Sequence, residues 1–218
     1  MSLLKAIQLF ILHHFEVTMR GRFIVFEGLD GCGKTTQMFY LRKKLLEAGV
    51  RCKEEREPSD GIIGLITRGA VRKKMVFGTE TMAHLFAADR YEHVINDILP
   101  ELERGISVLC DRYVYSSLAF QGLSMDMDKL LMYNKAALET LMPDLTLFID
   151  VPAAVCARRI SNERTHLELF EGDETLKIRE SFLRAFELFP ANVKIIDGDN
   201  SEEAVFTQVW DAVAPLFK

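Results

Sequence analysis

The chain has 218 residues and a net charge of −5, and its composition is ordinary for a globular protein. This length is enough to bury a sizeable core within one domain. The negative charge provides no general attraction to nucleic acid or to an anionic membrane, so we expect neither as a partner.

The first 18 residues mix apolar residues with Lys5, Gln8, His13 and His14. This segment is too short and too polar to span a bilayer, and it lacks the small-residue cleavage site of a secretory signal. It could form an amphipathic helix on the domain or on a partner chain, or it could be an upstream extension. We therefore expect an N-terminal extension over residues 1–18 and a single domain over residues 19–218.

Residues 23–37, FIVFEGLDGCGKTTQ, predict a phosphate-binding loop. The stretch begins as a buried parallel strand, then fits G-x-x-x-x-G-K-[ST] without a mismatch, and continues into a helical pattern. The glycines let backbone N–H groups close around phosphate oxygens, and the helix N-terminus adds partial positive charge. Lys34 is expected to bridge the β- and γ-phosphates of a nucleotide, and Thr35 to offer its hydroxyl to Mg²⁺. A chance glycine-rich turn is the alternative, and the flanking strand and helix argue against it.

The rest of the chain alternates strand and helix patterns. Strands are expected at residues 50–57, 106–110, 145–151 and 193–197, and helices at 62–72, 80–103, 113–121, 127–141, 153–160 and 174–189. Pro100 should kink or stop the second of these helical segments, residues 80–103. Asn200 and Glu203 fit a capping box that opens a last helix. The alternation predicts an α/β fold with a doubly wound five-stranded parallel sheet, helices on both faces and the ligand at its carboxyl edge.

Charged residues follow several of the predicted strands. Glu27 ends the first strand, Glu57 ends the second, and Asp111 and Arg112 end the third. An apolar strand that runs into a carboxylate is how Mg²⁺ or its waters are bound in phosphate-loop enzymes, so Asp111 is a candidate metal ligand. Arg112 could be an ordinary surface arginine, or it could hold a phosphate of a second substrate with both guanidinium nitrogens.

Five segments in this order resemble the thymidylate kinase family: FEGLDGCGKTTQ, REP, LFAADR, DRYVYSSLAFQG and PDLTLFIDVP. The match in order and spacing runs from about Arg22 to the C-terminus. The resemblance implies a nucleoside-monophosphate-kinase fold that transfers the γ-phosphoryl group of ATP to dTMP, giving dTDP and ADP for dTTP synthesis. It also implies Mg²⁺ dependence and a homodimer. The four scattered cysteines, which show no metal-ligand spacing, are typical of a cytoplasmic protein.

The resemblance also implies roles for individual residues. Asp30 would lie near the phosphoryl acceptor, Phe86 would stack on thymine, and the bulk of Phe120 would help to reject a ribose 2′-hydroxyl. The expected catalytic residues are Asp30, Lys34, Arg112 and Arg164, and the expected ATP-binding residues are Gly28, Gly31, Gly33, Lys34, Thr35, Thr36 and Arg159. The expected dTMP-binding residues are Glu57, Pro58, Arg68, Phe86, Arg90, Arg112, Ser116, Phe120 and Gln121, and the expected metal ligands are Thr35 and Asp111.

The sequence departs from the family at two places. Many bacterial members continue after Glu57 and Pro58 with Gly-Gly-Thr, whereas this chain has Ser-Asp-Gly, and Arg68 is our choice for the dTMP contact near this loop. Asp30 is followed by glycine, so the arginine that some members carry in the phosphate loop is missing. We expect a lid at about residues 161–172 to supply Arg164 in its place, with Arg159 on the preceding helix as the alternative.

Other functions stay open at this point. Phe86 could be an ordinary core residue. A kinase for another nucleoside or nucleoside monophosphate would have the same phosphate loop, and a non-catalytic nucleotide-binding regulator could retain it too. A GTPase is disfavoured because the nearest match to the guanine motif, which begins at Asn134, lacks its aspartate.

Overall fold

The computed structural model describes residues 20–163 and 172–217. The predicted extension at residues 1–18, most of the predicted lid and Arg164 lie outside them. The strands are β1 (Phe23–Glu27), β2 (Cys52–Arg56), β3 (Ser107–Asp111), β4 (Leu145–Asp150) and β5 (Val193–Asp197). The α-helices are α2 (Lys34–Glu47), α3 (Ile62–Val71), α4 (Thr79–His93), α5 (Leu99–Glu103), α6 (Val114–Gln121), α7 (Met127–Thr140), α8 (Ala153–Glu163), α9 (Gly172–Leu188) and α10 (Glu202–Val213). A π-helical segment, η1 (Val94–Ile98), joins α4 to α5, and a 3₁₀ turn, η2 (Ala214–Phe217), follows α10.

The strands form one parallel sheet in the order β2-β3-β1-β4-β5, with β1 at its centre. Every residue of β1 is fully buried, as expected of a central strand with helices on both faces. This confirms the predicted fold class. The carboxyl ends of parallel strands share one edge of the sheet, so the strand-end residues singled out in the sequence come together.

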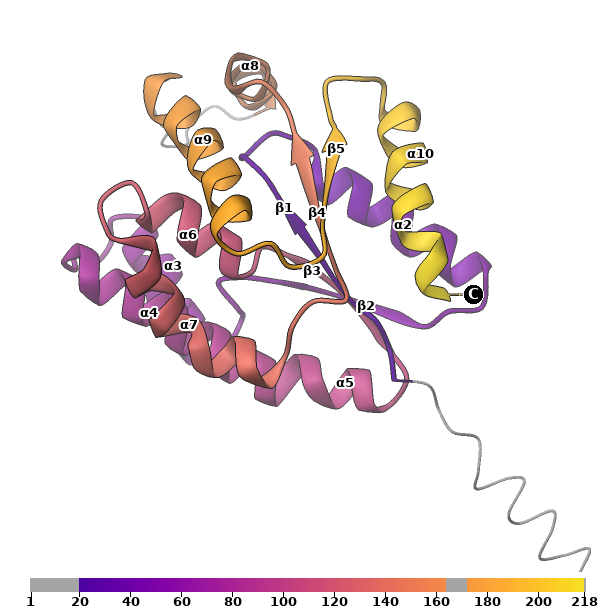
Figure 1. The fold of residues 1–218 in the computed structure, drawn as a ribbon, viewed down its shortest axis with the longest axis horizontal. Helices are drawn as coiled ribbons and strands as arrows, with labels where there is room; N and C mark the ends of the chain where they lie inside the picture. Colours follow the sequence, from indigo (N-terminus) through magenta and orange to yellow (C-terminus); the bar gives the residue numbers. More distant parts are fainter. Residues whose placement is uncertain (1–19, 164–171, 218) are drawn as a thin grey trace, which may run out of the picture.

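The helices cover the two faces of the sheet (Figure 1). Helices α2 and α10 pack together on one face, and α4, α6, α7 and α9 cover the other. Helix α3 packs against α4, and α8 packs against α9. No helix in the described ranges is both long and apolar enough to cross a membrane.

The predicted helix over residues 80–103 is interrupted by η1, directly before Pro100. Proline has no N–H, and its ring collides with the carbonyl group four residues earlier. In the wider π-turn the Leu99 N–H bonds to the carbonyl of Val94, five residues back. The helix thus accommodates Pro100 with a local change of pitch, and its backbone continues.

The predicted cap of the last helix was wrong by one residue. Ser201 is the N-cap of α10, and its hydroxyl accepts a hydrogen bond from the Ala204 N–H at 3.3 Å. The Asn200 side chain instead donates to the carbonyl of Asp197 at 3.5 Å. Both residue types make good caps, and only the helix start at Glu202 distinguishes them.

Candidate active site

The phosphate loop between β1 and α2 has the backbone geometry that the motif requires. Gly31 has a φ of +78°, and a Cβ there would lie 2.8 Å from the carbonyl oxygen of Cys156. Gly33, also at positive φ, is the N-cap of α2, and no side chain of the described residues caps this helix. Its first N–H groups therefore remain available to an anion. Lys34 is buried and donates to the carbonyl oxygens of Gly28 and Leu29 at 3.1 and 3.0 Å.

Asp111 carries the donor atom best suited to a metal ion. Its buried Oδ1 lies 3.9 Å from the Lys34 ammonium and has no hydrogen-bond partner among the described residues. Thr35, the other expected ligand, is exposed in the first turn of α2. The described residues hold no cluster of three or more His, Cys, Asp or Glu side chains around a metal position. One carboxylate plus substrate phosphates and water is a common ligand set for Mg²⁺, so these residues fit that ion.

Arg112 joins the phosphate loop to helix α6. Its Nη2 donates to Asp30 Oδ1 at 2.7 Å, and its Nη1 donates to Ser116 Oγ at 2.9 Å. The guanidinium carbon lies 5.0 Å from the centre of the Phe120 ring, in a cation–π contact. Burial lowers the pKa of Arg112, but the negative charges of Asp30, Asp111 and Glu27 outweigh it and raise the pKa above its ordinary value. The guanidinium is a permanent positive charge at the boundary between the two expected substrate sites.

Glu27 is a buried carboxylate whose partners the sequence did not reveal. Its Oε1 accepts the backbone N–H groups of Tyr113 and Ser116 at 2.9 and 3.1 Å, and its Oε2 accepts the Ser116 hydroxyl at 2.6 Å. Burial raises the pKa of Glu27 to about 7, although the Ser116 hydrogen bond and the charge of Arg112 lower it. The sequence signal was the charge at the end of a fully apolar strand.

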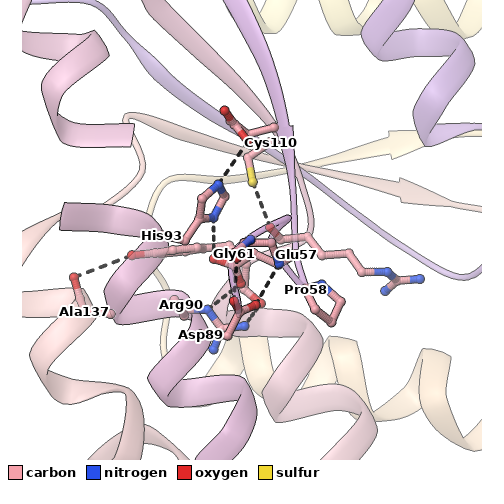
Figure 2. Close-up of polar contacts among 12 residues, drawn as sticks. Glu57, Pro58, Gly61, Asp89, Arg90, His93, Cys110 and Ala137 are labelled. Atoms are coloured by element: carbon pink, nitrogen blue, oxygen red, sulfur yellow. Dashed lines mark hydrogen bonds and ion pairs between the residues drawn. The ribbon is translucent and has the colours of Figure 1, made fainter. Parts of the chain in front are cut away.

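A second buried charge cluster lies at the end of β2 (Figure 2). Arg90 is 1% exposed and donates through Nε to Glu57 Oε2 at 2.7 Å. It also donates to the Ser117 hydroxyl at 3.0 Å, to the carbonyl oxygen of Tyr113 at 2.9 Å and to Asn134 Oδ1. Arg90 is thus bound on several sides by protein groups, and its expected contact with dTMP stays a prediction.

His93 completes this cluster, and the sequence analysis missed it. The ring lies between two carboxylates, with Nε2 3.1 Å from Glu55 Oε2 and Nδ1 3.5 Å from Glu57 Oε1. Burial lowers the pKa of His93, but the two glutamates outweigh it and raise the pKa to about 9. His93 is therefore a buried cation at neutral pH. The available signal was its place three residues after Arg90, on the same face of α4.

The residues after Glu57 form an acceptor loop, residues 57–61, that is fixed from two sides. Both oxygens of the buried Asp89 bind Ser59: Oδ2 accepts its N–H at 2.7 Å and Oδ1 its hydroxyl at 2.5 Å. Arg68 donates to the carbonyl oxygens of Pro58, at 2.7 Å, and of Ser59, and it pairs with Asp60 at 3.0 Å. Arg68 therefore holds the loop in place, and its expected contact with dTMP stays a prediction.

The remaining expected site residues are less tightly bound. Arg159 lies beside the phosphate loop, with Nη1 3.4 Å from the carbonyl oxygen of Cys32 and Nη2 3.4 Å from that of Gly198. Gln121 has a buried Oε1 without a partner in the described ranges, and Phe86 is half-buried on α4. Gly28 lies in the phosphate loop and Thr36 in the first turn of α2, and their expected contacts with ATP stay predictions.

Comparisons with known proteins agree with this geometry. A family model for thymidylate kinase matches residues 26–209. The chain is 38% identical over 198 residues to a probable thymidylate kinase of Pyrococcus horikoshii, covering 88% of this chain and 95% of that protein. It is 38% identical over 208 residues to a thymidylate kinase of Geobacter sulfurreducens, covering 88% and 96%. It is 36% identical over 205 residues to one of Caldanaerobacter subterraneus, covering 92% and 98%.

Proposed function

Because this chain belongs to the thymidylate kinase family and is a dTMP kinase, we propose that the carboxyl edge of its sheet aligns ATP and dTMP for phosphoryl transfer. The products are dTDP and ADP. The observation that carries the proposal is the 2.7 Å pair between Arg112 and Asp30, which joins the expected acceptor arginine to the phosphate loop. Phosphoryl transfer depends on positioning and charge neutralisation, and a guanidinium held beside the phosphate loop supports the proposal on both counts.

On the donor side, the loop N–H groups and Lys34 bind the phosphates of ATP. Lys34 exchanges its two carbonyl partners for phosphate oxygens, which are stronger acceptors because they are charged. Asp111 and Thr35 would hold Mg²⁺, which supplies positive charge to the β- and γ-phosphate oxygens when bound. Arg159, beside Cys32, faces the ATP side. Arg164 is proposed as the lid cation, and Arg159 is the alternative.

On the acceptor side, Arg112 holds the phosphate of dTMP, and Asp30 orients the guanidinium. Phe86 stacks on thymine, while Phe120 and Gln121 line the pocket for base and sugar. Glu57, Pro58 and Arg90 form the wall of this pocket at the end of β2. Because Arg112 also stacks on Phe120, the phosphate and sugar positions are coupled through one side chain.

A panel assay tests the proposed acceptor. ADP release is measured with dTMP, dUMP, UMP, dCMP, dGMP and dAMP at one ATP concentration. We expect dTMP to give the highest kcat/KM. A higher kcat/KM for another monophosphate would contradict the assignment.

Two variants test the two halves of the site. Lys34→Ala should lower kcat by an amount that corresponds to roughly 2.7–4 kcal/mol, as for the loss of one transition-state donor. Arg112→Ala should raise the KM for dTMP and lower kcat, with the KM for ATP little changed. If Arg112→Ala weakened ATP binding and left dTMP binding intact, Arg112 would belong to the donor side.

We also propose a cytoplasmic homodimer. Exposed apolar side chains gather on α3 and directly after it: Ile62, Leu65, Ile66, Val71, Met75, Val76 and Phe77. An apolar surface of this kind is typical of a protein–protein interface. Light scattering should give a dimer for the parent chain and a monomer for Leu65→Asp. A monomeric parent at micromolar concentration would contradict the proposal.

A further inference from the structure

Glu27 is fully buried and yet binds only the first turn of α6. Its three hydrogen bonds go to the Tyr113 N–H, the Ser116 N–H and the Ser116 hydroxyl. A buried carboxylate is costly to retain unless each oxygen is bound, and here both are. An apolar residue would fill the same space at lower cost, so this carboxylate requires an explanation beyond packing.

The carboxylate acts as the cap that α6 lacks. In the described chain, the N-cap residue Tyr113 makes no side-chain hydrogen bond to the helix. Glu27, which ends β1, instead accepts hydrogen bonds from two of the N–H groups at the start of this helix. Negative charge at a helix N-terminus is also favourable to the helix dipole. These hydrogen bonds hold the end of β1 against the N-terminus of α6.

The same carboxylate fixes the direction of the Ser116 hydroxyl. Because this O–H donates to Glu27 at 2.6 Å, its lone pairs are left to accept from Arg112 Nη1 at 2.9 Å. The backbone N–H of Arg112 donates to the Phe26 carbonyl at 2.9 Å, and its φ is +76°. Arg112 is therefore held at its backbone by β1 and at its guanidinium by Ser116 and Asp30.

We propose that Glu27 is a positioning residue for phosphoryl transfer, which orients the guanidinium of Arg112 through the Ser116 hydroxyl and the N-terminus of α6. This inference rests on the proposed role of Arg112 as the residue that holds the acceptor phosphate. Glu27 itself is 0% exposed. It acts only through Ser116 and Arg112.

Steady-state kinetics of Glu27→Gln and Ser116→Ala test the inference. Each should raise the KM for dTMP by about tenfold and lower kcat, with the KM for ATP changed by less than twofold. The double variant should be no worse than the more impaired single variant, because both changes break one chain of contacts. If the two residues acted independently, the effect of the double variant on kcat/KM would be the product of the two single effects, and that result would overturn the inference.

Ser181→Ala is the matched control. Ser181 is also buried, and its hydroxyl donates to the Leu118 carbonyl, on the same helix α6 but away from Arg112. The Ser181→Ala variant should have a lower melting temperature than the parent and the same KM for dTMP. If Glu27→Gln behaved like Ser181→Ala, Glu27 would be structural only and the inference would be overturned.

The result for Arg112→Ala separates this inference from the function on which it rests. Normal dTMP kinetics in Arg112→Ala would remove the proposed role of Arg112 and the inference with it. Impaired Arg112→Ala together with unimpaired Glu27→Gln and Ser116→Ala would overturn the inference alone. If Glu27→Gln does not fold, Ser116→Ala alone tests the inference. A KM for dTMP in Ser116→Ala within twofold of the parent value would then overturn the inference.

Discussion

Glu27 and Glu57 occupy similar places in the fold but are satisfied in different ways. Each follows or ends a strand at the carboxyl edge of the sheet, and each is buried. Glu57 binds two cations, Arg90 at 2.7 Å and His93 at 3.5 Å. Glu27 binds two backbone N–H groups and one hydroxyl, all of them neutral.

The difference separates two ways of fixing an active site. The cluster around Glu57 ties β2 to α4 through opposite charges, so the loss of any one charge leaves the others buried and unbalanced. The contacts of Glu27 use the directions of neutral hydrogen-bond donors, so they orient Ser116 and Arg112 with less dependence on net charge. We expect the first cluster to control stability and the second to control geometry.

The largest expected effect comes from the same substitution at the two glutamates. Glu57→Gln removes the counter-charge of Arg90 and one of the two carboxylates beside His93, and it should reduce the free energy of unfolding by about 3–5 kcal/mol. Glu27→Gln serves as its matched control and should cost about 1–2 kcal/mol, because neutral donors lose less. Urea denaturation at pH 7 measures both. Equal losses of unfolding free energy in the two variants would mean that charged and neutral hydrogen-bond partners stabilise these glutamates equally.

The charge on His93 predicts a pH dependence. Its pKa is raised from 6.5 to about 9 on folding. The stabilisation is therefore complete below pH 6.5 and is lost as the pH rises toward 9, with a slope of at most about 1.4 kcal/mol per pH unit. Urea denaturation across this window checks the slope. The variant His93→Gln should flatten it, and an unchanged slope would assign it to another group.

Glu27 predicts a smaller effect in a lower pH window. Burial raises its pKa from 4.5 to about 7, so the unfolded chain ionises first and stability falls as the pH rises between these values. Glu27→Gln cannot ionise, and the stability difference from the parent should shrink across the window. The comparison needs only denaturation curves of the two proteins at pH 5 and pH 7. A growing difference would show that the carboxylate is stabilised as an anion.

The smallest expected effect comes from Ser201, the cap of α10, and it allows the stability contributed by this local cap to be compared with that of Glu27 at α6. Ser201→Ala removes the side-chain cap of α10 and should cost about 1 kcal/mol. It should leave the kinetics unchanged, because the described hydrogen bond of the Ser201 hydroxyl stays within the start of α10. If Ser201→Ala cost more than Glu27→Gln, the cap of α6 would contribute little to stability, and its value would lie in orientation alone.

Much of the fold and part of the site could be predicted because the signals are local. The apolar run of β1 and the glycines after it lie within fifteen residues, and Asp111 ends a strand that Arg112 directly follows. The strand alternation then placed these residues at one edge. Nothing more than neighbouring residues and the rule for parallel sheets was needed.

The partners of the buried charges could not be predicted because they depend on strand order and helix packing. Glu27 meets Ser116 only because β3, which leads into α6, lies beside β1. His93 meets Glu55 only because α4 crosses the end of β2. The hydrogen bonds of Arg68 to the acceptor loop depend on the backbone path of residues 57–61, which the periodicity of apolar residues does not predict. Each of these contacts spans elements whose relative position the sequence pattern leaves open.

The strand order also determines when the phosphate loop can acquire its shape during synthesis. β1 and β2 leave the ribosome first, but they are not neighbours in the sheet, since β3 lies between them. β1 has no partner until Ser107–Asp111 has been made, and its second partner is complete only at Asp150. Pairing over such separations is slow, and it leaves apolar strands exposed in the nascent chain. The residues of the phosphate loop are thus translated early, but they are held in position only after β4 has emerged.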